Sequence, residues 1–254
     1  MGKIIIFANQ KGGVTKTTST WLVAAGLKQR GYKVLAVDFE GQGDLSDSAK
    51  AEVEKYVTSY DLVKGEATAA ECIQQLDVFD IIPANNLLYK AEKELMAEMG
   101  GDYKLKEALE PIKSQYDFIL VDTPPAFGSL TTNALTAADE IIIMTTGGKY
   151  SVKAINNLYQ TIQENKKYCG SKGYIRGIVF TRVKAGTTAY KIMSSVGENI
   201  CNELQIPVFQ TTIREATAIE NAQIKQVDIF TLQDNKELIA DYNAFIDEIL
   251  AERK

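Results

Sequence analysis

The sequence contains no histidine among its 254 residues. A nucleophilic site that relies on a Ser-His or Cys-His pair is therefore excluded, and so is a metal site with imidazole ligands. Only 3 cysteines occur, namely Cys72, Cys169 and Cys201, and their wide spacing matches neither a zinc site nor a redox pair. We expect buried, reduced thiols in a cytosolic protein.

The chain also lacks a long apolar run and an excess of positive charge. No apolar segment is long enough to span a bilayer, and residues 3–7 do not have the layout of a signal peptide. The net charge is -5, so any contact with nucleic acid must come from a local basic patch. Hydrophobic residues make up 45% of the chain and charged residues 24%, which predicts one globular domain over residues 1–254.

Short apolar runs alternate with longer amphipathic stretches. The runs are rich in Ile, Val and Phe, which is typical of parallel strands covered on both faces. We expect strands at 4–8, 34–37, 79–82, 118–121, 141–144, 175–180 and 206–209. Helices are expected at 17–30, 149–167 and 189–204, with short helices within 44–77. This alternation predicts an α/β fold with a doubly wound, mostly parallel sheet flanked by helices, which binds ligands beyond the carboxyl ends of its strands.

A glycine-containing loop follows the first expected strand. Residues 9–18 read Asn-Gln-Lys-Gly-Gly-Val-Thr-Lys-Thr-Thr and open a helix. This order is the layout of a P-loop, in which backbone N–H groups bind phosphate. We expect Gly12 and Gly13 to let the backbone approach phosphate closely. Lys16 would then reach the β and γ phosphates, and the Thr17 hydroxyl would bind Mg²⁺.

The loop departs from the strict pattern G-x-x-x-x-G-K-[ST], because Gln10 and Thr15 occupy its glycine positions. A chance Gly-Gly loop is the alternative interpretation. Residues 11–18 resemble, however, the deviant Walker A loop of the ParA, MinD and nitrogenase-iron-protein group of dimeric P-loop ATPases. The resemblance implies ATP and Mg²⁺ as cofactors, and makes Lys11 the signature lysine that reaches the partner subunit's nucleotide. The nucleotide-binding residues that it implies are Lys11, Gly12, Gly13, Val14, Thr15, Lys16, Thr17 and Thr18.

Two acidic segments follow buried strands. Residues 37–44 resemble the ParA switch I segment D-x-D-P-Q-G-N, with Asp38 at its first Asp. Glu40 replaces the second Asp, which the family uses for hydrolysis, and Gly41 replaces the Pro. Residues 119–126 resemble the Walker B and switch II segment with its D-T-P-P, and Asp122 there would hold Mg²⁺ through a water. A lone strand-end Asp is otherwise a helix cap or a solvated charge.

These matches define an expected catalytic site. The resemblance implies catalytic roles for Lys11, Lys16, Asp38 and Glu40. It implies that Thr17, Asp38 and Asp122 hold Mg²⁺, partly through water. Two departures from the family pattern bear on the rate of ATP hydrolysis. The β-branched Thr15 resists positive φ, and the Glu40 side chain is one methylene longer than that of Asp. We expect normal ATP binding and slow hydrolysis.

Weaker matches extend into the second half of the chain. Residues 181–183 follow a strand where relatives place base-contacting residues, and residues 208–215 resemble V-F-x-T-x-I-P-R without its Pro. The resemblance implies nucleotide contacts from Thr181, Arg182 and Arg214, and the lack of an Asn-Lys-x-Asp base reader favours ATP over GTP. The candidate DNA contacts are Arg182, Lys184, Lys191, Arg214 and Lys225. Each of these alone is also explained as a solvated surface charge.

The cysteines do not fall where the nitrogenase iron protein holds its cluster. MinD-type proteins bind membrane through a basic C-terminal helix. The expected helix at 236–254 has an apolar stripe and an acidic opposite face instead, which favours a helix docked on its own core.

The chain most resembles short, Soj-like ParA proteins. This resemblance implies a cytoplasmic, nucleoid-associated ATPase for plasmid or chromosome partition. Such a protein forms a homodimer with ATP and binds DNA non-specifically. Its hydrolysis responds to a ParB-type centromere-binding partner, and it does not bind membrane. The alternatives are a nucleotide-controlled regulatory module with little hydrolysis and a MinD-like membrane-cycling ATPase.

Overall fold

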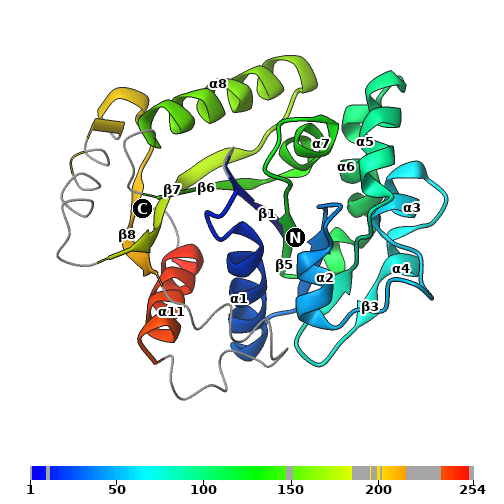
Figure 1. Cartoon of the computed structure of the whole chain (residues 1–254), viewed down its shortest axis with the longest axis horizontal. Coiled ribbons are helices and arrows are strands. Elements are labelled where there is room, and N and C mark those ends of the chain that lie inside the picture. The colour runs from blue at the N-terminus through cyan, green and yellow to red at the C-terminus, as the bar shows by residue number, and fades with distance from the viewer. Residues whose placement is uncertain are drawn as a thin grey trace.

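A central sheet of eight strands runs through the computed structural model of the chain (Figure 1). The structure describes residues 2–9, 12–146, 151–184, 195, 199–200, 202–215 and 236–251. The strand order is β3-β4-β2-β5-β1-β6-β7-β8. The strands are β1 Lys3–Ala8, β2 Val34–Asp38, β3 Gln74–Gln75, β4 Asp80–Ile82, β5 Phe118–Asp122, β6 Glu140–Thr146, β7 Tyr174–Val183 and β8 Val208–Arg214.

Every neighbouring pair in the sheet is parallel except β3 with β4. The doubly wound α/β fold that the sequence predicts is thereby confirmed, and each of the seven expected strands is present. The expected strand at 206–209 begins later and ends later, as β8. β3 was not expected, because a strand of two residues has no periodicity to detect.

Helices cover both faces of the sheet. One face carries α1 Lys16–Gln29, α2 Asp44–Ala49 and α11 Lys236–Leu250, whose apolar side chains share one buried cluster. The other face carries α3 Ser59–Lys64, α4 Ala69–Cys72, α5 Leu88–Ala97, α6 Lys104–Leu109, α7 Ser129–Ala137 and α8 Ser151–Cys169. The 3₁₀ turns η1 Gly101–Tyr103 and η2 Glu110–Gln115 flank α6. The expected helices at 17–30 and 149–167 correspond to α1 and α8, while most of 189–204 lies outside the described residues.

The short helices expected within 44–77 are α2, α3 and α4, and local capping explains the last two. Thr58 precedes α3, where its hydroxyl accepts from the Tyr60 N–H and its own N–H donates to the Asp61 carboxylate at 2.7 Å. Thr68 and Glu71 form the same reciprocal pair at α4. Such capping boxes satisfy backbone donors that the first helical turn leaves unpaired.

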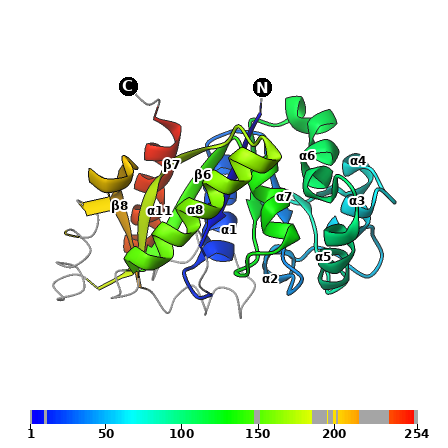
Figure 2. The same ribbon diagram turned by 90° about the horizontal axis from the view of Figure 1, so that it is seen from above.

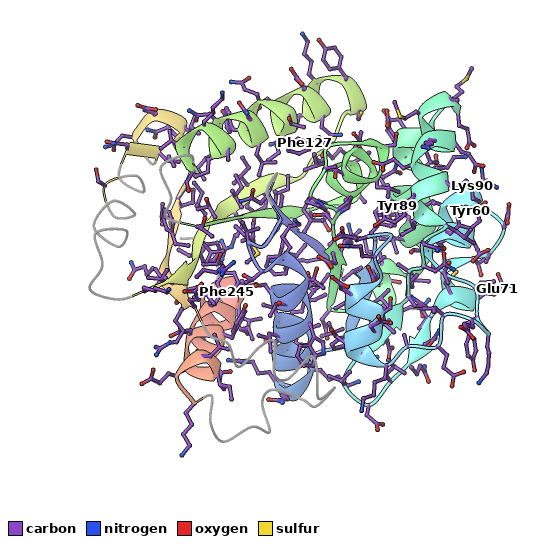
Figure 3. All side chains as sticks on the ribbon, in the orientation of Figure 1. Tyr60, Glu71, Tyr89, Lys90, Phe127 and Phe245 are labelled. Carbon is purple, nitrogen blue, oxygen red and sulfur yellow. The ribbon has the colours of Figure 1, made fainter. Side chains whose placement is uncertain are left out.

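The C-terminal helix α11 is docked on the core, as the sequence predicts. Phe245 is fully buried and its ring centroid lies 5.1 Å from that of Phe209 and 6.3 Å from that of Phe7 (Figure 3). The Glu248 carboxylate accepts the N–H groups of Gln210 and Thr211, at 2.9 and 2.7 Å. Acidic residues of α11 thus cover the free edge of β8 instead of forming only a solvated face. Among the described residues, no helix has the length and apolar character needed to cross a membrane.

The thiols follow the expectation in part. Cys72 is buried, and burial, with the nearby carboxylates of Asp61 and Glu71, raises its pKa to about 12. Cys169 is only half-buried, which corrects the expectation of full burial, because α8 ends there and its last turn leaves the core. Cys201 lies outside the described residues.

Candidate nucleotide and magnesium site

The carboxyl ends of the three central strands meet at one edge of the sheet. Asp38, the last residue of β2, lies opposite Asp122, the last residue of β5, and Asp122 also pairs with Phe7 of β1. The loop between β1 and α1 lies at this same edge, which is the lower edge in Figure 2. The sheet therefore brings the expected phosphate loop and both expected acids together.

Unusual backbone angles shape the loop. Gly13 has φ 73°, which glycine adopts freely, but Thr15 also lies in the left-handed region, at φ 66°. A β-branched residue is disfavoured there, so the resistance expected from the sequence is overcome by the surrounding structure. The Thr15 hydroxyl donates to the Val14 carbonyl at 2.6 Å and leaves the first turn of α1 without a side-chain cap. The free N–H groups of that turn suit an anion.

Lys16, the first residue of α1, carries the positive charge of the loop into a buried position. Only 6% of it is exposed. Burial lowers the pKa of Lys16, and the nearby carboxylates of Asp122 and Glu40 oppose that shift. A buried ammonium held beside two acids is prepared to receive a phosphate, whose negative charge would replace lost hydration.

Asp38 is fully buried at the end of β2. Its carboxylate accepts the Ser46 N–H at 2.9 Å, the Ser46 hydroxyl at 2.6 Å and the Glu40 N–H at 3.2 Å. Ser46 lies in the first turn of α2, so Asp38 accepts one N–H of that turn from outside the helix, although Gly43 is the N-cap residue. Burial is the main cause that raises the pKa of Asp38 to about 6, against the effect of these hydrogen bonds.

Asp122 has an unused oxygen. Its Oδ1 is buried and has no hydrogen-bond partner, while the Thr17 hydroxyl lies close enough to the carboxyl group to lower its pKa. Burial above all, and then the charge of Asp38, raises the pKa of Asp122 well above its ordinary value. An orphaned carboxylate oxygen beside a hydroxyl and a second Asp is the donor set that Mg²⁺ prefers.

The residues therefore fit a magnesium ion that is bound together with phosphate. No group of three or more acidic, Cys or His side chains suited to a metal occurs within the described part of the chain. Mg²⁺ bound to a nucleotide needs only one or two carboxylates, since phosphate oxygens and waters complete its shell. Thr123 stabilises the arrangement, because its hydroxyl donates to the Phe7 carbonyl at 2.9 Å and ties β5 to β1.

Comparison with known proteins identifies the family. A family model described as an AAA domain matches residues 2–173. The sporulation initiation inhibitor protein Soj of Bacillus subtilis is 35% identical and covers 87% of this chain and 88% of its own length. The chromosome-partitioning ATPase Soj of Treponema pallidum is 34% identical, with 87% of each chain covered. The chain belongs to the Soj/ParA family of P-loop ATPases.

Solved structures agree on the fold. An ATP complex of McdA from Cyanothece superposes with a TM-score of 0.86 at 21% identity, and the match covers 100% of this chain and 98% of that one. At that identity it supports the fold alone. A cobyrinic acid a,c-diamide synthase from Mycobacterium smegmatis, solved with an ATP analogue and magnesium, gives a TM-score of 0.83 at 26% identity, covering 98% and 95% of the two chains.

Two residues of β7 support the ParA-type loop from the side. Thr181 is fully buried and its hydroxyl donates to the Val14 carbonyl at 3.2 Å. Arg182 donates to the Gly13 carbonyl at 3.3 Å. The Thr181 hydroxyl also lies 3.5 Å from the Thr145 carbonyl, and Arg182 also donates to Glu215 at 2.7 Å. The base contacts expected of these two residues stay a prediction.

The remaining basic candidates are paired with carboxylates or lie outside the described residues. Arg214 pairs with Asp241, at 2.7 Å, and with Glu237, both on α11. Lys184 pairs with Glu215 at 2.8 Å. Neither charge forms a basic patch in this conformation. The expected residues that lie outside the described part of the chain are Lys11, Lys191 and Lys225.

Helix α5 packs against Gly41 of the first switch segment and against Gly128, two residues beyond the second, which the sequence did not indicate. A Cβ placed on Gly41 would lie 2.8 Å from ring carbons of Tyr89, and one on Gly128 would lie 1.9 Å from the Glu92 carboxylate. The only signal was the glycine at 41, where ParA switch I segments carry proline.

Glu40 lies between these parts and is half-buried. Its pKa rises to about 6, chiefly through burial, with further increases from Asp38 and Asp44 and an opposing effect from Lys16. The Glu40 carboxylate is thus close enough to the Lys16 ammonium for that positive charge to lower the pKa of Glu40. It stands at the position where the expected catalytic carboxylate of switch I belongs.

Proposed function

We propose that the protein is an ATP-dependent switch for DNA partition. ATP binds through the loop with Lys16 and Thr17, and Mg²⁺ is held by Thr17, Asp38 and Asp122, partly through water. Two subunits then close face to face, each offering Lys11 to the other's site. The closed dimer binds DNA non-specifically, and a ParB-type partner stimulates hydrolysis, which opens the dimer and releases the DNA. The protein acts in the cytoplasm, on the nucleoid, for plasmid or chromosome cargo.

One observation carries the proposal: Asp122 presents an unpartnered buried oxygen beside Thr17, Lys16 and Asp38. Such a cluster is costly in the free protein, because each buried charge has lost hydration. Mg²⁺ and phosphate would supply the missing partners, so binding energy is available to drive a change of conformation. The relatives named Soj and a chromosome-partitioning ATPase support partition as the use of that change.

Dimerisation is the first step to test. The oligomeric state is measured by size-exclusion chromatography with light scattering, without nucleotide, with ADP and with Mg²⁺ and ATP, for the wild type and Lys11→Ala. We expect Mg²⁺ and ATP alone to convert the wild type to a dimer, whereas Lys11→Ala binds ATP but stays monomeric. An oligomeric state that ignores nucleotide in the wild type would contradict the switch mechanism.

DNA binding is tested next, by the salt dependence of binding to a duplex of arbitrary sequence. We expect binding only with Mg²⁺ and ATP, and a fall in affinity as salt rises. Because Lys184 and Arg214 are ion-paired in this conformation, their role in DNA contact requires that the pairs open in the dimer. Unchanged affinity and salt slope in a Lys184→Ala, Arg214→Ala double variant would remove both residues from the DNA surface.

A second candidate is a nucleotide-controlled binding module with little hydrolysis. Glu40 favours it, because its carboxylate extends one methylene beyond that of Asp and would displace an attacking water. We measure ATP turnover with DNA and partner present, for the wild type and Glu40→Asp. A rate increase of at least tenfold in Glu40→Asp would show that the glutamate holds turnover down. Equal rates would disprove the slow-hydrolysis interpretation.

A MinD-like membrane cycle is disfavoured by α11. Its apolar residues are buried in the core, and its carboxylates hold the N–H groups of β8. Sedimentation with anionic liposomes and ATP distinguishes DNA partition from a membrane cycle. We expect the protein to stay in the supernatant, and its recovery with the liposomes would support the membrane cycle.

A further inference from the structure

A hydrogen-bonded chain connects the C-terminal helix to the phosphate loop. The hydroxyl of Tyr242, on α11, lies 2.8 Å from the hydroxyl of Ser19, on α1. Ser19 in turn donates its backbone N–H to the Thr15 carbonyl at 2.8 Å. The Thr15 side chain is also close enough to the Tyr242 hydroxyl to lower its pKa, against the larger effect of burial. Tyr242, 223 residues beyond Ser19 in the sequence, therefore contacts the first turn of α1, directly after Thr15.

Thr15 is the residue that needs such support. It is a β-branched residue at φ 66°, in the left-handed region, directly before the first residue of α1. That conformation is disfavoured for a non-glycine residue, above all for one branched at Cβ. Thr15 stands at the second glycine position of the strict P-loop pattern, where glycine adopts the same angles without cost. Neighbouring structure must therefore hold the loop in its phosphate-binding shape.

Tyr242 is suited to this task because packing holds it in place. It is fully buried, and α11 is fixed to the sheet in two ways. The Phe245 ring packs on Phe7 and Phe209, and the carboxylates of Asp241 and Glu248, both on α11, accept backbone N–H groups of β8. A buried hydroxyl that lost its partners would be left unsatisfied, so the network opposes any movement of Thr15 away from α11. Figure 1 shows α11 beside α1 on the same face of the sheet.

We propose that Tyr242 is a positioning residue for nucleotide binding, which holds the left-handed Thr15 and so keeps the phosphate loop in its binding conformation. It replaces, through hydrogen bonds from the C-terminal helix, the backbone freedom that a glycine at position 15 would provide. This inference rests on the proposed nucleotide site, and concerns how this chain forms that site without the usual glycine.

The decisive experiment is a double-mutant cycle with Tyr242→Phe and Thr15→Gly. The affinity of the full-length protein for a fluorescent ATP analogue with Mg²⁺ is measured for the wild type, both single variants and the double variant. We expect Tyr242→Phe to weaken binding about fivefold, as loss of one buried hydrogen bond would. Whatever the affinity of Thr15→Gly itself, we expect the double variant to bind within about twofold of it, because a glycine at position 15 needs no support from Tyr242.

Tyr116→Phe provides the matched control. Its hydroxyl donates to Asp80 at 2.8 Å, and the pair lies at the amino ends of the strands, away from the loop. It should lower stability without changing nucleotide affinity. An equal loss of affinity from Tyr242→Phe in both backgrounds would mean that the tyrosine merely docks α11, and no loss in the wild type would mean that it does not position the loop. Either result overturns the proposal.

A measurement without nucleotide separates this inference from the proposed function. If the wild type binds no nucleotide, the proposed function fails, but the network can still be tested by urea unfolding of the same four proteins. The inference then requires that Tyr242→Phe lowers the unfolding midpoint less in the Thr15→Gly background than in the wild type. Equal shifts of the midpoint in both backgrounds would reject it.

Discussion

At the scale of single residues, the glycine at position 41 illustrates how one side chain permits another. ParA switch I segments carry proline there, whereas the Tyr89 ring of α5 packs directly over Gly41 in this chain. The Tyr89 hydroxyl also lies near Glu40, Asp44 and Glu92, which together with burial raise its pKa. Gly41 thus leaves room for the Tyr89 ring, and a larger side chain at position 41 would push that ring aside.

Gly41→Ala tests this pairing. An added Cβ would lie 2.8 Å from ring carbons of Tyr89, a side chain that is 48% exposed and can turn aside, so we expect a loss of about 1 kcal/mol in the free energy of unfolding. In a Tyr89→Ala background the same change should cost less than about 0.5 kcal/mol, because the ring is gone. Gly12→Ala is the control for the loop, since its Cβ would meet nothing within 4 Å. Equal costs in both backgrounds, measured by urea unfolding, would show that the contact does not limit position 41.

At the scale of secondary structure, the edge strand β8 depends on a helix from the end of the chain. One carboxylate, that of Glu248, accepts two backbone N–H groups, and Asp241 accepts a third, from Arg214. An exposed strand edge is otherwise a template for aggregation. The acidic face of α11 therefore protects the sheet, in addition to disfavouring an anionic membrane.

Glu248→Ala should therefore destabilise the protein by about 1–2 kcal/mol, because two N–H groups lose a charged acceptor. Glu237→Ala is the matched control on the same helix. Its side chain is 82% exposed and, within the part of the chain that the structure describes, pairs with Arg214 alone, so its loss should cost less than about 1 kcal/mol. Urea unfolding followed by circular dichroism measures both. The idea fails if the two variants lose equal stability.

The elements differ in how far the sequence could foretell them. The central strands were predictable, since runs such as residues 4–8 and 118–121 are apolar throughout and are buried on both faces. The carboxyl-end positions of Asp38 and Asp122 followed from the same pattern. The contacts of Tyr242 with Ser19 and of Tyr89 with Gly41 were not predictable, because each joins segments far apart in the chain and depends on packing rather than on local pattern. The sequence marked Thr15 as a residue that resists positive φ, but it could not indicate the distant contacts that hold Thr15 in that conformation.

At the scale of the whole molecule, the site gathers carboxylates whose burial opposes folding. The pKa of Asp38 rises to about 6, and that of Asp122 also rises, chiefly because burial penalises their charged forms. A carboxyl group whose pKa is higher in the folded state binds more protons when folded than when unfolded. The folded protein is therefore favoured below the raised pKa, and that advantage is lost as pH rises through the window between about 4 and 6.

This sign predicts a pH effect on the metal-free and nucleotide-free protein. We expect the free energy of unfolding of the wild type, relative to Asp38→Asn, to fall by on the order of 2 kcal/mol between about pH 4.5 and pH 7.5. The asparagine of that variant would keep an acceptor for Ser46 but cannot ionise, so the comparison cancels the titration of groups whose pKa does not depend on Asp38 and reports Asp38 together with its neighbours Asp122 and Glu40. Urea unfolding in the presence of EDTA gives both values at each pH. A constant difference would mean that Asp38 is hydrated or paired in the free protein, and that its burial does not store energy for Mg²⁺ and ATP to release.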